Sequence, residues 1–404
     1  MKRKYLIFIL LIVICGYFLF TYNYPDDLKI NGNGTGLDLE TELDMEKIKE
    51  EETQEVQEPK ITTASILAVG DIMFHMPQNN AALNLDNKTY DFTNNFKYVK
   101  KYIQSADLSI ANFETVVAEG RKYSGFPNFN SPIETLFAIE DAGFHILTTA
   151  NNHCLDQGKI GLINTIDTIE SLGMKNIGTY KSPDRDILIE DINEIKIGIL
   201  AYCYGFNGMD YTLTEEERKY MISEIDEGKI KEDIEKAKKL DVDIVVVFIH
   251  WGHEYHDEPS SEQIELGRKM VEWGANIVLG SHPHVIQKSE IINSGGKDNF
   301  IIYSMGNFLS NQRFEIMNNK FTEDGIIVKI QVEKDFNNNN TTIRNIEYIP
   351  TWVRKYKIDN KFQYEILPIK DFLEDESLLN TLEEVEKVRI KESYQNTMDK
   401  MFKY

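Results

Sequence analysis

The feature that most constrains the fold of this chain is a series of short, continuous apolar runs separated by stretches with helical periodicity. The runs occupy residues 65–70, 108–112, 146–150, 197–202, 244–249, 277–279 and 300–304. Helical stretches lie between several of them, at residues 133–142, 162–172, 215–240 and 261–273. Short strands that alternate with helices are typical of an α/β fold built around a largely buried sheet.

After residue 320 the pattern changes to strand-like segments without long helices, at 325–332 and 342–348, and residues 370–404 have the pattern of an acidic amphipathic helix or tail. The 404 residues leave room for one large α/β domain or two ordinary ones. The formal net charge is −22. Because binding to nucleic acid needs clustered Lys and Arg, we expect no nucleic-acid partner.

The N-terminus has the pattern of a single-pass membrane anchor at residues 1–22. Three basic residues at 2–4 precede 18 residues without charge or proline at 5–22, which is near the shortest length that spans a bilayer. The positive flank favours a cytoplasmic N-terminus and an extracytoplasmic remainder. The alternatives are a cleaved signal peptide, although there is no A-x-A-like site, and a lipoprotein processed at Cys15, although the residue before it is the large Ile14.

Residues 23–60 have the composition of an acidic flexible linker. Positions 25–60 hold 12 acidic residues and 4 lysines, so this segment buries too little apolar surface to offset the entropy of ordering it. We expect the folded domain to span 61–355 and to be followed by an acidic C-terminal extension at 356–404.

Polar residues that can bind metals follow the apolar runs, each at the C-terminal end of its predicted strand. In open α/β sheets ligands bind outside the carboxyl ends of the strands. Six strand ends that carry such side chains are therefore expected to converge on one edge. In chain order these side chains are Asp71 and His75; Asn112 and Glu114; Asn151, Asn152 and His153; His250, His253 and Glu254; His282 and His284; and Ser304 and Asn307.

The residue types indicate a divalent metal site. Carboxylate, amide and neutral imidazole ligands suit Mn, Fe or Zn. More than four ligands indicates two ions that share a bridging carboxylate, and such a pair can clamp an oxyanion and generate hydroxide at neutral pH. We predict a site built from Asp71, Glu114, Asn152, His250, His282 and His284, with His75 as an additional candidate.

Taken singly, most of these residues have plainer interpretations. Asp71 could cap a turn or a helix, Glu114 could lie in a solvated loop, and Asn307 could simply shape a turn. The His282-Pro-His284 motif is the most specific, because both rings point the same way if the segment is extended.

At these residues the chain resembles the CapA-type capsule synthesis proteins, also called poly-γ-glutamate synthesis proteins. The resemblance runs from about residue 63 to 310. It implies the calcineurin-like metallophosphoesterase fold, which is an α/β four-layer sandwich of two mixed β-sheets flanked by helices. The motifs are Gly70-Asp-Ile-Met73, Asn112-Phe-Glu114, Ala150-Asn-Asn-His153, His250-Trp-Gly-x-Glu254-Tyr255, Gly280-Ser-His-Pro-His284 and Ser304-Met-Gly-Asn-Phe308.

The resemblance also implies roles for single residues. Asp71, Asn152, His250, His282 and His284 match metal ligands of the phosphoesterases, and Glu114 stands where these enzymes have a bridging aspartate. His153 matches the histidine near the leaving group and is our candidate general acid, with Glu254 as a second candidate. Two positions depart from the phosphoesterase pattern: Met73 replaces a histidine, and Glu114 is one methylene longer than aspartate.

By this resemblance we expect a component of capsule (poly-γ-glutamate) biosynthesis, and by its N-terminal pattern we expect it at the cell membrane with its domain outside. Its expected partners are the membrane, poly-γ-glutamate or another anionic polymer, and other capsule synthase subunits. Two functions remain open. One is a metal-dependent hydrolase or transferase that acts on a phosphoester or a γ-glutamyl amide. The other is a non-catalytic membrane subunit that supports polymer synthesis or export.

Overall fold

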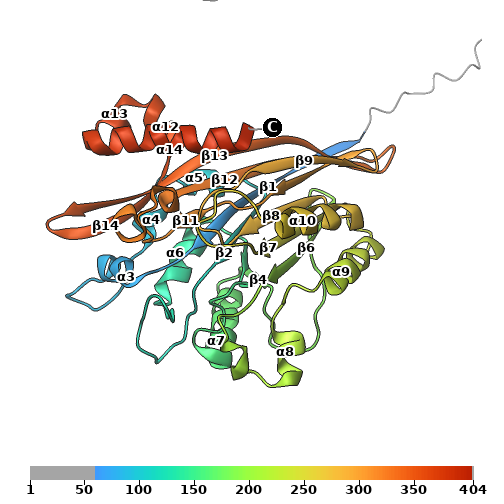
Figure 1. The fold of residues 1–404 in the computed structure, drawn as a ribbon, viewed down its shortest axis with the longest axis horizontal. Helices are drawn as coiled ribbons and strands as arrows, with labels where there is room; N and C mark the ends of the chain where they lie inside the picture. Colours follow the sequence, from blue (N-terminus) through green and yellow to red (C-terminus); the bar gives the residue numbers. More distant parts are fainter. Residues whose placement is uncertain (1–59, 403–404) are drawn as a thin grey trace, which may run out of the picture. The chain divides into compact units, whose positions relative to one another are not determined.

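The computed structural model describes residues 60–402 of the chain (Figure 1). The predicted anchor at 1–22 and nearly all of the predicted linker at 23–60 lie outside the described residues. Among residues 60–402, no helix has the length and apolar character needed to cross a membrane.

One of the two sheets has eight strands of mixed direction. Its order is β14-β13-β12-β1-β2-β3-β4, and β11 pairs separately with β1. The strands from β1 to β4 run parallel to their neighbours, whereas β12, β13 and β14 add antiparallel strands on the other side of β1. The strands are β1 (Ile61–Ile72), β2 (Leu108–Phe113), β3 (Ile146–Thr148), β4 (Lys175–Ile177), β11 (Asn307–Leu309), β12 (Asp324–Asp335), β13 (Asn340–Ile358) and β14 (Lys361–Pro368).

The second sheet has six strands in the order β5-β6-β7-β8-β10-β9. Its four central strands are parallel, and an antiparallel strand closes each edge. The strands are β5 (Leu188–Ile192), β6 (Ile195–Cys203), β7 (Ile244–His250), β8 (Ile277–Ser281), β9 (Ser289–Ser294) and β10 (Lys297–Ile302).

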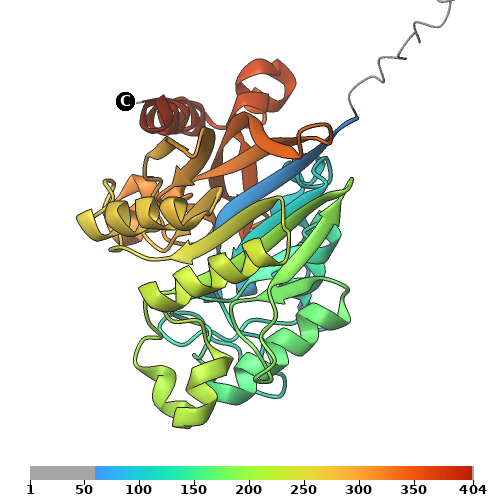
Figure 2. The ribbon, with the colours of Figure 1, turned by 90° about the vertical axis from the view of Figure 1, so that its right-hand side faces the viewer.

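The two sheets pack face to face because successive side chains of a strand point to opposite faces. In β1, Ile66 and Ala68 belong to the core between the sheets, whereas Leu67 and Val69 belong to a second core on the outer face. In β7, Phe248 lies between the sheets, and its neighbours pack outward. Helices therefore cover both outer faces, which confirms the predicted α/β fold with two mixed sheets (Figure 2).

The helices on the outer faces are short to medium in length. Helix α6 packs on the eight-stranded sheet, and helices α9 and α10 pack on the six-stranded sheet. The helices are α3 (Met76–Ala82), α4 (Thr93–Phe96), α5 (Lys100–Ile103), α6 (Glu134–Ala142), α7 (Gly158–Ser171), η2 (Met209–Thr212), α8 (Glu215–Met221), α9 (Glu227–Lys239), α10 (Ser261–Trp273), α11 (Phe314–Met317), η3 (Lys320–Glu323), α12 (Ile369–Glu374), α13 (Glu376–Leu379) and α14 (Glu384–Phe402).

The stretch predicted as one helix at 215–240 is two helices, α8 and α9. Between them Ile222 forms a bridge with Thr179, and the Asp226 side chain caps α9 by accepting a hydrogen bond from the Lys229 amide at 2.7 Å. Both segments have helical periodicity, but Asp226 is an N-cap and begins a second helix.

The C-terminal residues continue the eight-stranded sheet. Residue 355, where we placed the end of the domain, lies inside β13, which pairs with β14. Helices α12 and α14 pack on these strands through a small core that includes Trp352, Phe372 and Ile390. The helix expected within 370–404 is present as α14, and β14 was not predicted.

Candidate metal centre

The predicted ligands lie where the C-terminal ends of strands from both sheets meet. Asp71 is the last residue but one of β1 and Glu114 follows β2, both in the eight-stranded sheet. His250 ends β7 and His282 follows β8, both in the six-stranded sheet. We expected these strand ends to lie at one edge of a single sheet, whereas they come from two sheets. Each of these side chains is at most 3% exposed.

The eight-stranded sheet contributes two carboxylates joined by an amide. Asn112 Nδ2 donates to Asp71 Oδ1 at 2.8 Å and to Glu114 Oε2 at 3.3 Å. Asn151 in turn donates to Asn112 Oδ1 at 3.1 Å. The amide therefore holds the two carboxylates side by side, although like charges repel in a buried site.

The six-stranded sheet contributes three imidazoles. His284 Nε2 lies 3.8 Å from Glu114 Oε1, and His250 Nε2 lies 3.6 Å from the same oxygen. The ring centroids of His250 and His282 are 4.7 Å apart. The segment is not extended as we had assumed, because His282 and His284 have φ values of 98° and 57°. Such left-handed conformations are costly for residues other than glycine.

These side chains form two overlapping groups with the composition of a metal site. One group is Asp71, Glu114 and His250, and the other is Glu114, His282 and His284; within each, one ligand atom per residue lies within 4.8 Å of the others. Glu114 belongs to both. Two buried atoms of the set, Glu114 Oε1 and His282 Nδ1, have no hydrogen-bond partner among the described residues. Since buried polar atoms are normally paired, these orphaned atoms fit a divalent ion.

Burial tunes the protonation of the set. Burial, and then the neighbouring Asp71, raise the pKa of Glu114 well above its usual value. Burial lowers the pKa of His250 well below its usual value and lowers the pKa of His282 to about 3. The imidazoles of His250 and His282 are therefore neutral at physiological pH, which is the form that binds metals.

Two further residues hold the second ring nitrogen of a predicted ligand. Ser281 Oγ lies 2.9 Å from His250 Nδ1, and Asn307 Oδ1 lies 3.1 Å from His284 Nδ1. Such partners orient metal-binding imidazoles. Sequence reasoning missed Ser281, and it named Asn307 at a strand end without including it in the ligand set, although both lie inside the quoted motifs.

Asn152 and His153 border the ligand groups. Asn152 Oδ1 lies 2.9 Å from His250 Nε2. His153 Nδ1 lies 2.8 Å from Asp156 Oδ2, and its ring packs edge-on against Phe129 with centroids 4.8 Å apart. Sequence reasoning missed Asp156, although its spacing of three residues from His153 was a signal.

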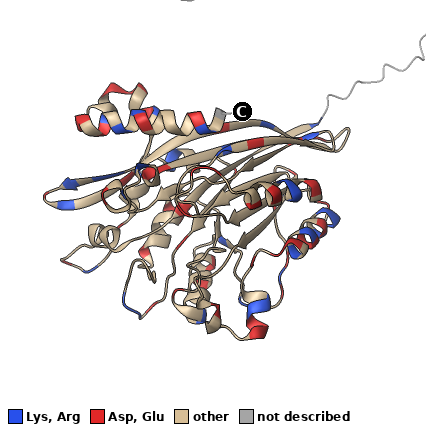
Figure 3. Ribbon diagram, viewed as in Figure 1, with Lys and Arg blue, Asp and Glu red and all other residues tan. Residues whose placement is uncertain are grey.

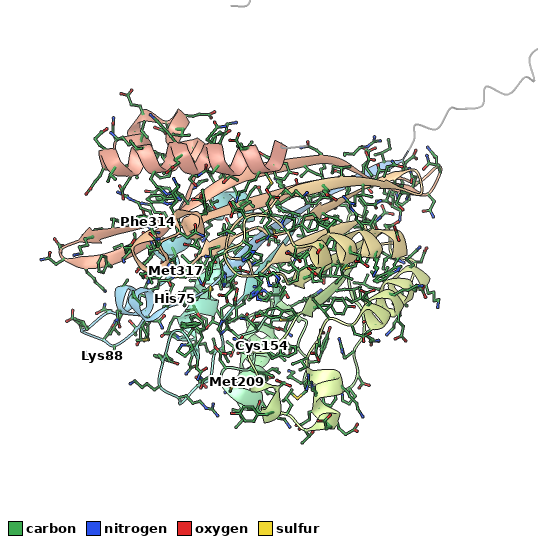
Figure 4. The ribbon with its side chains drawn as sticks, viewed as in Figure 1. His75, Lys88, Cys154, Met209, Phe314 and Met317 are labelled. Atoms are coloured by element: carbon green, nitrogen blue, oxygen red, sulfur yellow. The ribbon has the colours of Figure 1, made fainter. Side chains whose placement is uncertain are left out.

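Two other predicted residues lie outside both groups. Glu254 is exposed on the loop after β7. His75 is half-buried and its Nδ1 lies 3.3 Å from both the Gln78 side chain and the Asn311 amide (Figure 4). Its pKa is lowered to about 4 by burial. The roles of these residues, and of the other candidate site residues, stay predictions.

Two glycines allow the strands to meet closely at the site. A Cβ on Gly70, next to Asp71, would lie 2.0 Å from the Gly306 carbonyl oxygen, and a Cβ on Gly280 would lie 2.0 Å from the Tyr303 carbonyl oxygen. No side chain fits at either distance, so glycine is required where each strand delivers its ligand.

An α/β sandwich of two mixed sheets with a buried His, Asp and Glu cluster at the strand ends defines a class of candidate metalloproteins. The family model described as "Bacterial capsule synthesis protein PGA_cap" matches residues 65–312, and the chain belongs to this family. The chain is similar to the capsule biosynthesis protein CapA of Bacillus anthracis, with 32% identity over 227 residues, which covers 54% of each protein. It is 28% identical over 246 residues to the PGA biosynthesis protein CapA of Bacillus subtilis (strain 168), which covers 59% of this chain and 61% of that protein. The matches thus span little more than half of these relatives.

Solved structures with a related arrangement include a phosphatase from Mycoplasma pneumoniae, with a TM-score of 0.43 and 15% identity over 72% of this chain and 94% of that chain. The calcineurin-like phosphoesterase YfkN from Bacillus subtilis has a TM-score of 0.41 and 13% identity over 84% of this chain and 99% of that chain.

Proposed function

We propose that this protein is a membrane-anchored, extracytoplasmic component of poly-γ-glutamate capsule biosynthesis that works as a metal-dependent hydrolase. The observation that carries the proposal is the pair of ligand groups that share Glu114, with its unpaired Oε1. Membership of the capsule synthesis family supports the process, and the basic flank at 2–4 supports the topology.

The proposed residues divide the chemical work. A divalent ion bound here would supply Lewis-acid polarisation of a phosphoryl or carbonyl oxygen. Asp71, Glu114 and the three histidines would hold it. His153 would give a proton from Nε2 to the leaving oxygen or nitrogen, because its Nδ1 is engaged by Asp156 Oδ2. The proposed substrate is a phosphoester or a γ-glutamyl amide.

The second candidate function is a non-catalytic subunit that binds metal or polymer and supports synthesis or export. One observation favours it. Met73 is buried at the position where phosphoesterases have a histidine, and the nearby His75 is engaged by Gln78 and Asn311. A site with one ligand fewer than a working phosphoesterase can hold metal without supporting turnover.

The metal content of the 404-residue chain tests the proposed site. We expect the wild-type chain to retain Mn, Fe or Zn after dialysis. The double variant His282→Ala with His284→Ala should lose it and stay folded by circular dichroism, because two of the ligands that surround Glu114 are gone. The control replaces the exposed His253 and His256 by Ala and should keep its metal.

Assays with a phosphodiester and with a γ-glutamyl oligomer then separate the two functions. Hydrolysis by the wild-type chain and not by the double variant supports the enzyme. Retained metal without hydrolysis of either substrate supports the non-catalytic subunit. Unchanged metal content in a folded double variant contradicts the proposed centre.

A further inference from the structure

A cavity of about 290 Å³ lies on the outer side of the six-stranded sheet. Its walls are the end of β6, helices α8 and α9, and the segment 180–187. None of the candidate metal ligands lines it. A second cavity of about 290 Å³ adjoins it, because Arg185, Tyr202, Lys219 and Lys229 line both. This size is at the lower end of the range for small-molecule sites.

The lining of this cavity is rich in cations. Arg185, Lys219, Lys229 and Lys236 line it, whereas its acidic residues are Asp186 and Asp233. The chain as a whole has a net charge of −22, so a site with more cations than acids is unusual on it. Figure 3 shows Lys and Arg on the neighbouring helices α8 and α9.

The acid at the base of the cavity is already neutralised. The Tyr202 hydroxyl donates to Asp233 Oδ2 at 2.9 Å, and Lys229 Nζ lies 2.8 Å from Asp233 Oδ1. Asp186 is 97% exposed, and its carboxylate lies 3.7 Å from Lys236 Nζ. The two acids therefore leave the positive charge of the lining in excess.

Arg185 is the cation that lacks a carboxylate. Its guanidinium lies over the Tyr180 ring at 4.4 Å, and Nη2 donates to Ser223 Oγ at 2.7 Å. No Asp or Glu oxygen within residues 60–402 forms an ion pair with it, whereas Lys219, Lys229 and Lys236 each have one. A stacked guanidinium is held in place, and its remaining N–H groups suit the two oxygens of a carboxylate or a phosphate.

We propose that this cavity is an oxyanion-binding site, separate from the metal centre, in which Arg185 binds the carboxylate or phosphate group of a small ligand. Lys219 and Lys236 contribute positive charge at the rim. The proposal does not depend on hydrolytic activity or on the metal.

Calorimetric titration of the 404-residue chain tests the site, in low-salt buffer because salt screens exposed charges. The two probes are inorganic phosphate and a γ-linked triglutamate, which distinguish a phosphate from a carboxylate ligand. Each titration is done on the wild-type chain in chelator and on the His282→Ala with His284→Ala variant, so that the metal centre cannot account for binding.

We expect Arg185→Gln to weaken binding of at least one probe by roughly tenfold or more, because a hydrogen bond to a charged group is lost. Lys236→Gln should weaken it by a few-fold. The control, Lys181→Gln, removes a charge that pairs with Asp167 and Glu170 outside the cavity and should bind as the wild type does. Equal binding by Arg185→Gln and wild type, or no binding of either probe, overturns the proposal.

Discussion

Glu114 links the two ligand groups, and its length explains how. The phosphoesterase pattern has aspartate at this position, and the extra methylene of glutamate places Oε1 3.6 Å from His250 Nε2 and 3.8 Å from His284 Nε2. One oxygen thus faces histidines from two different strands. The substitution is consistent with a bridging ligand, because the longer side chain still reaches both groups.

At the level of single residues, the proposed acid can be tested apart from the metal. We expect His153→Gln to keep its metal, because His153 belongs to neither ligand group, and to lose about 10²–10⁴ of any hydrolytic rate, the usual effect of removing a general acid. Asp156→Asn should lose less of the rate, because the amide oxygen of asparagine can still accept a hydrogen bond from His153 Nδ1. Metal content and rate are measured on the same samples.

The matched control for this prediction is His145→Gln. His145 is exposed, and its Nδ1 lies 2.8 Å from Ser109 Oγ. It is not part of the site, so the hydrolytic rate of this variant should equal that of the wild type. A wild-type rate in His153→Gln would exclude this residue as the acid.

The sequence predicted which carboxylate and imidazole side chains converge better than it predicted the partners that orient them. Asp71, Glu114, His250, His282 and His284 come together as expected, because strand ends are local in sequence and their convergence follows from the topology. Asp156 lies in a turn and Ser281 ends β8, and both were missed because hydrophobic periodicity does not predict contacts between polar side chains. The prediction that the segment from His282 to His284 is extended was wrong. A left-handed conformation on either side of a proline has no sequence signal when glycine is absent.

At the level of elements, α14 is fixed to the sheet by buried ion pairs. Arg389 Nη2 lies 2.5 Å from Asp324 Oδ1, and the Ser393 hydroxyl donates to the same oxygen at 2.7 Å. Asp324 begins β12, and its carbonyl oxygen lies beside Gly306, close to Asn307. The helix therefore reaches the strand that borders the site.

We expect Arg389→Met to destabilise the protein by about 3 kcal/mol at pH 7.5, because it leaves a buried carboxylate without its partner. Burial raises the pKa of Asp324 to about 6, above the value of the unfolded chain. Protonation therefore favours the folded state below pH 6, and this contribution is lost as the pH rises through 6. The decrease in the free energy of unfolding caused by Arg389→Met should thus be smaller at pH 5 than at pH 7.5, as measured by urea denaturation.

Arg344→Met is the control for this pair. Its ion pair with Glu333 is exposed at the arginine, so its removal should cost less than about 1 kcal/mol at both pH values. An equal effect of the two substitutions would show that α14 is not held by Asp324.

The elements that the sequence predicted are those with a strong apolar pattern. The central strands β1, β2, β6, β7 and β8 lie at the predicted positions, because they are buried on both faces. The edge strands β5, β9 and β14 were missed. Strands β5 and β9 are half-buried and β14 begins with exposed residues, so their mixed composition resembles that of loops. The break between α8 and α9 was missed because residues 215–240 were predicted as one continuous helix, with no account of Asp226 as an N-cap.

At the level of the whole molecule, the proposed topology makes a separate prediction. If residues 5–22 span the membrane with the basic flank inside, a Glu-specific protease added to cells with a permeable wall should cut the acid-rich segment 23–60 and release the domain. An immunoblot of the membrane and soluble fractions measures the release. A cytoplasmic protein serves as control and should stay intact.

A domain that stays with the membrane until the cells are lysed would place it in the cytoplasm and contradict this topology. It would not affect the metal centre, because the ligands at 71–284 lie within the described domain and do not depend on the anchor.

The division of the ligands between two sheets has a mechanical consequence. Asp71 and Glu114 come from one sheet, and His250, His282 and His284 come from the other. An ion bound by ligands from both sheets would therefore cross-link the two sheets of the sandwich. Metal binding would then stabilise the packing of the two sheets, and a change that loosens this packing would lower the metal affinity.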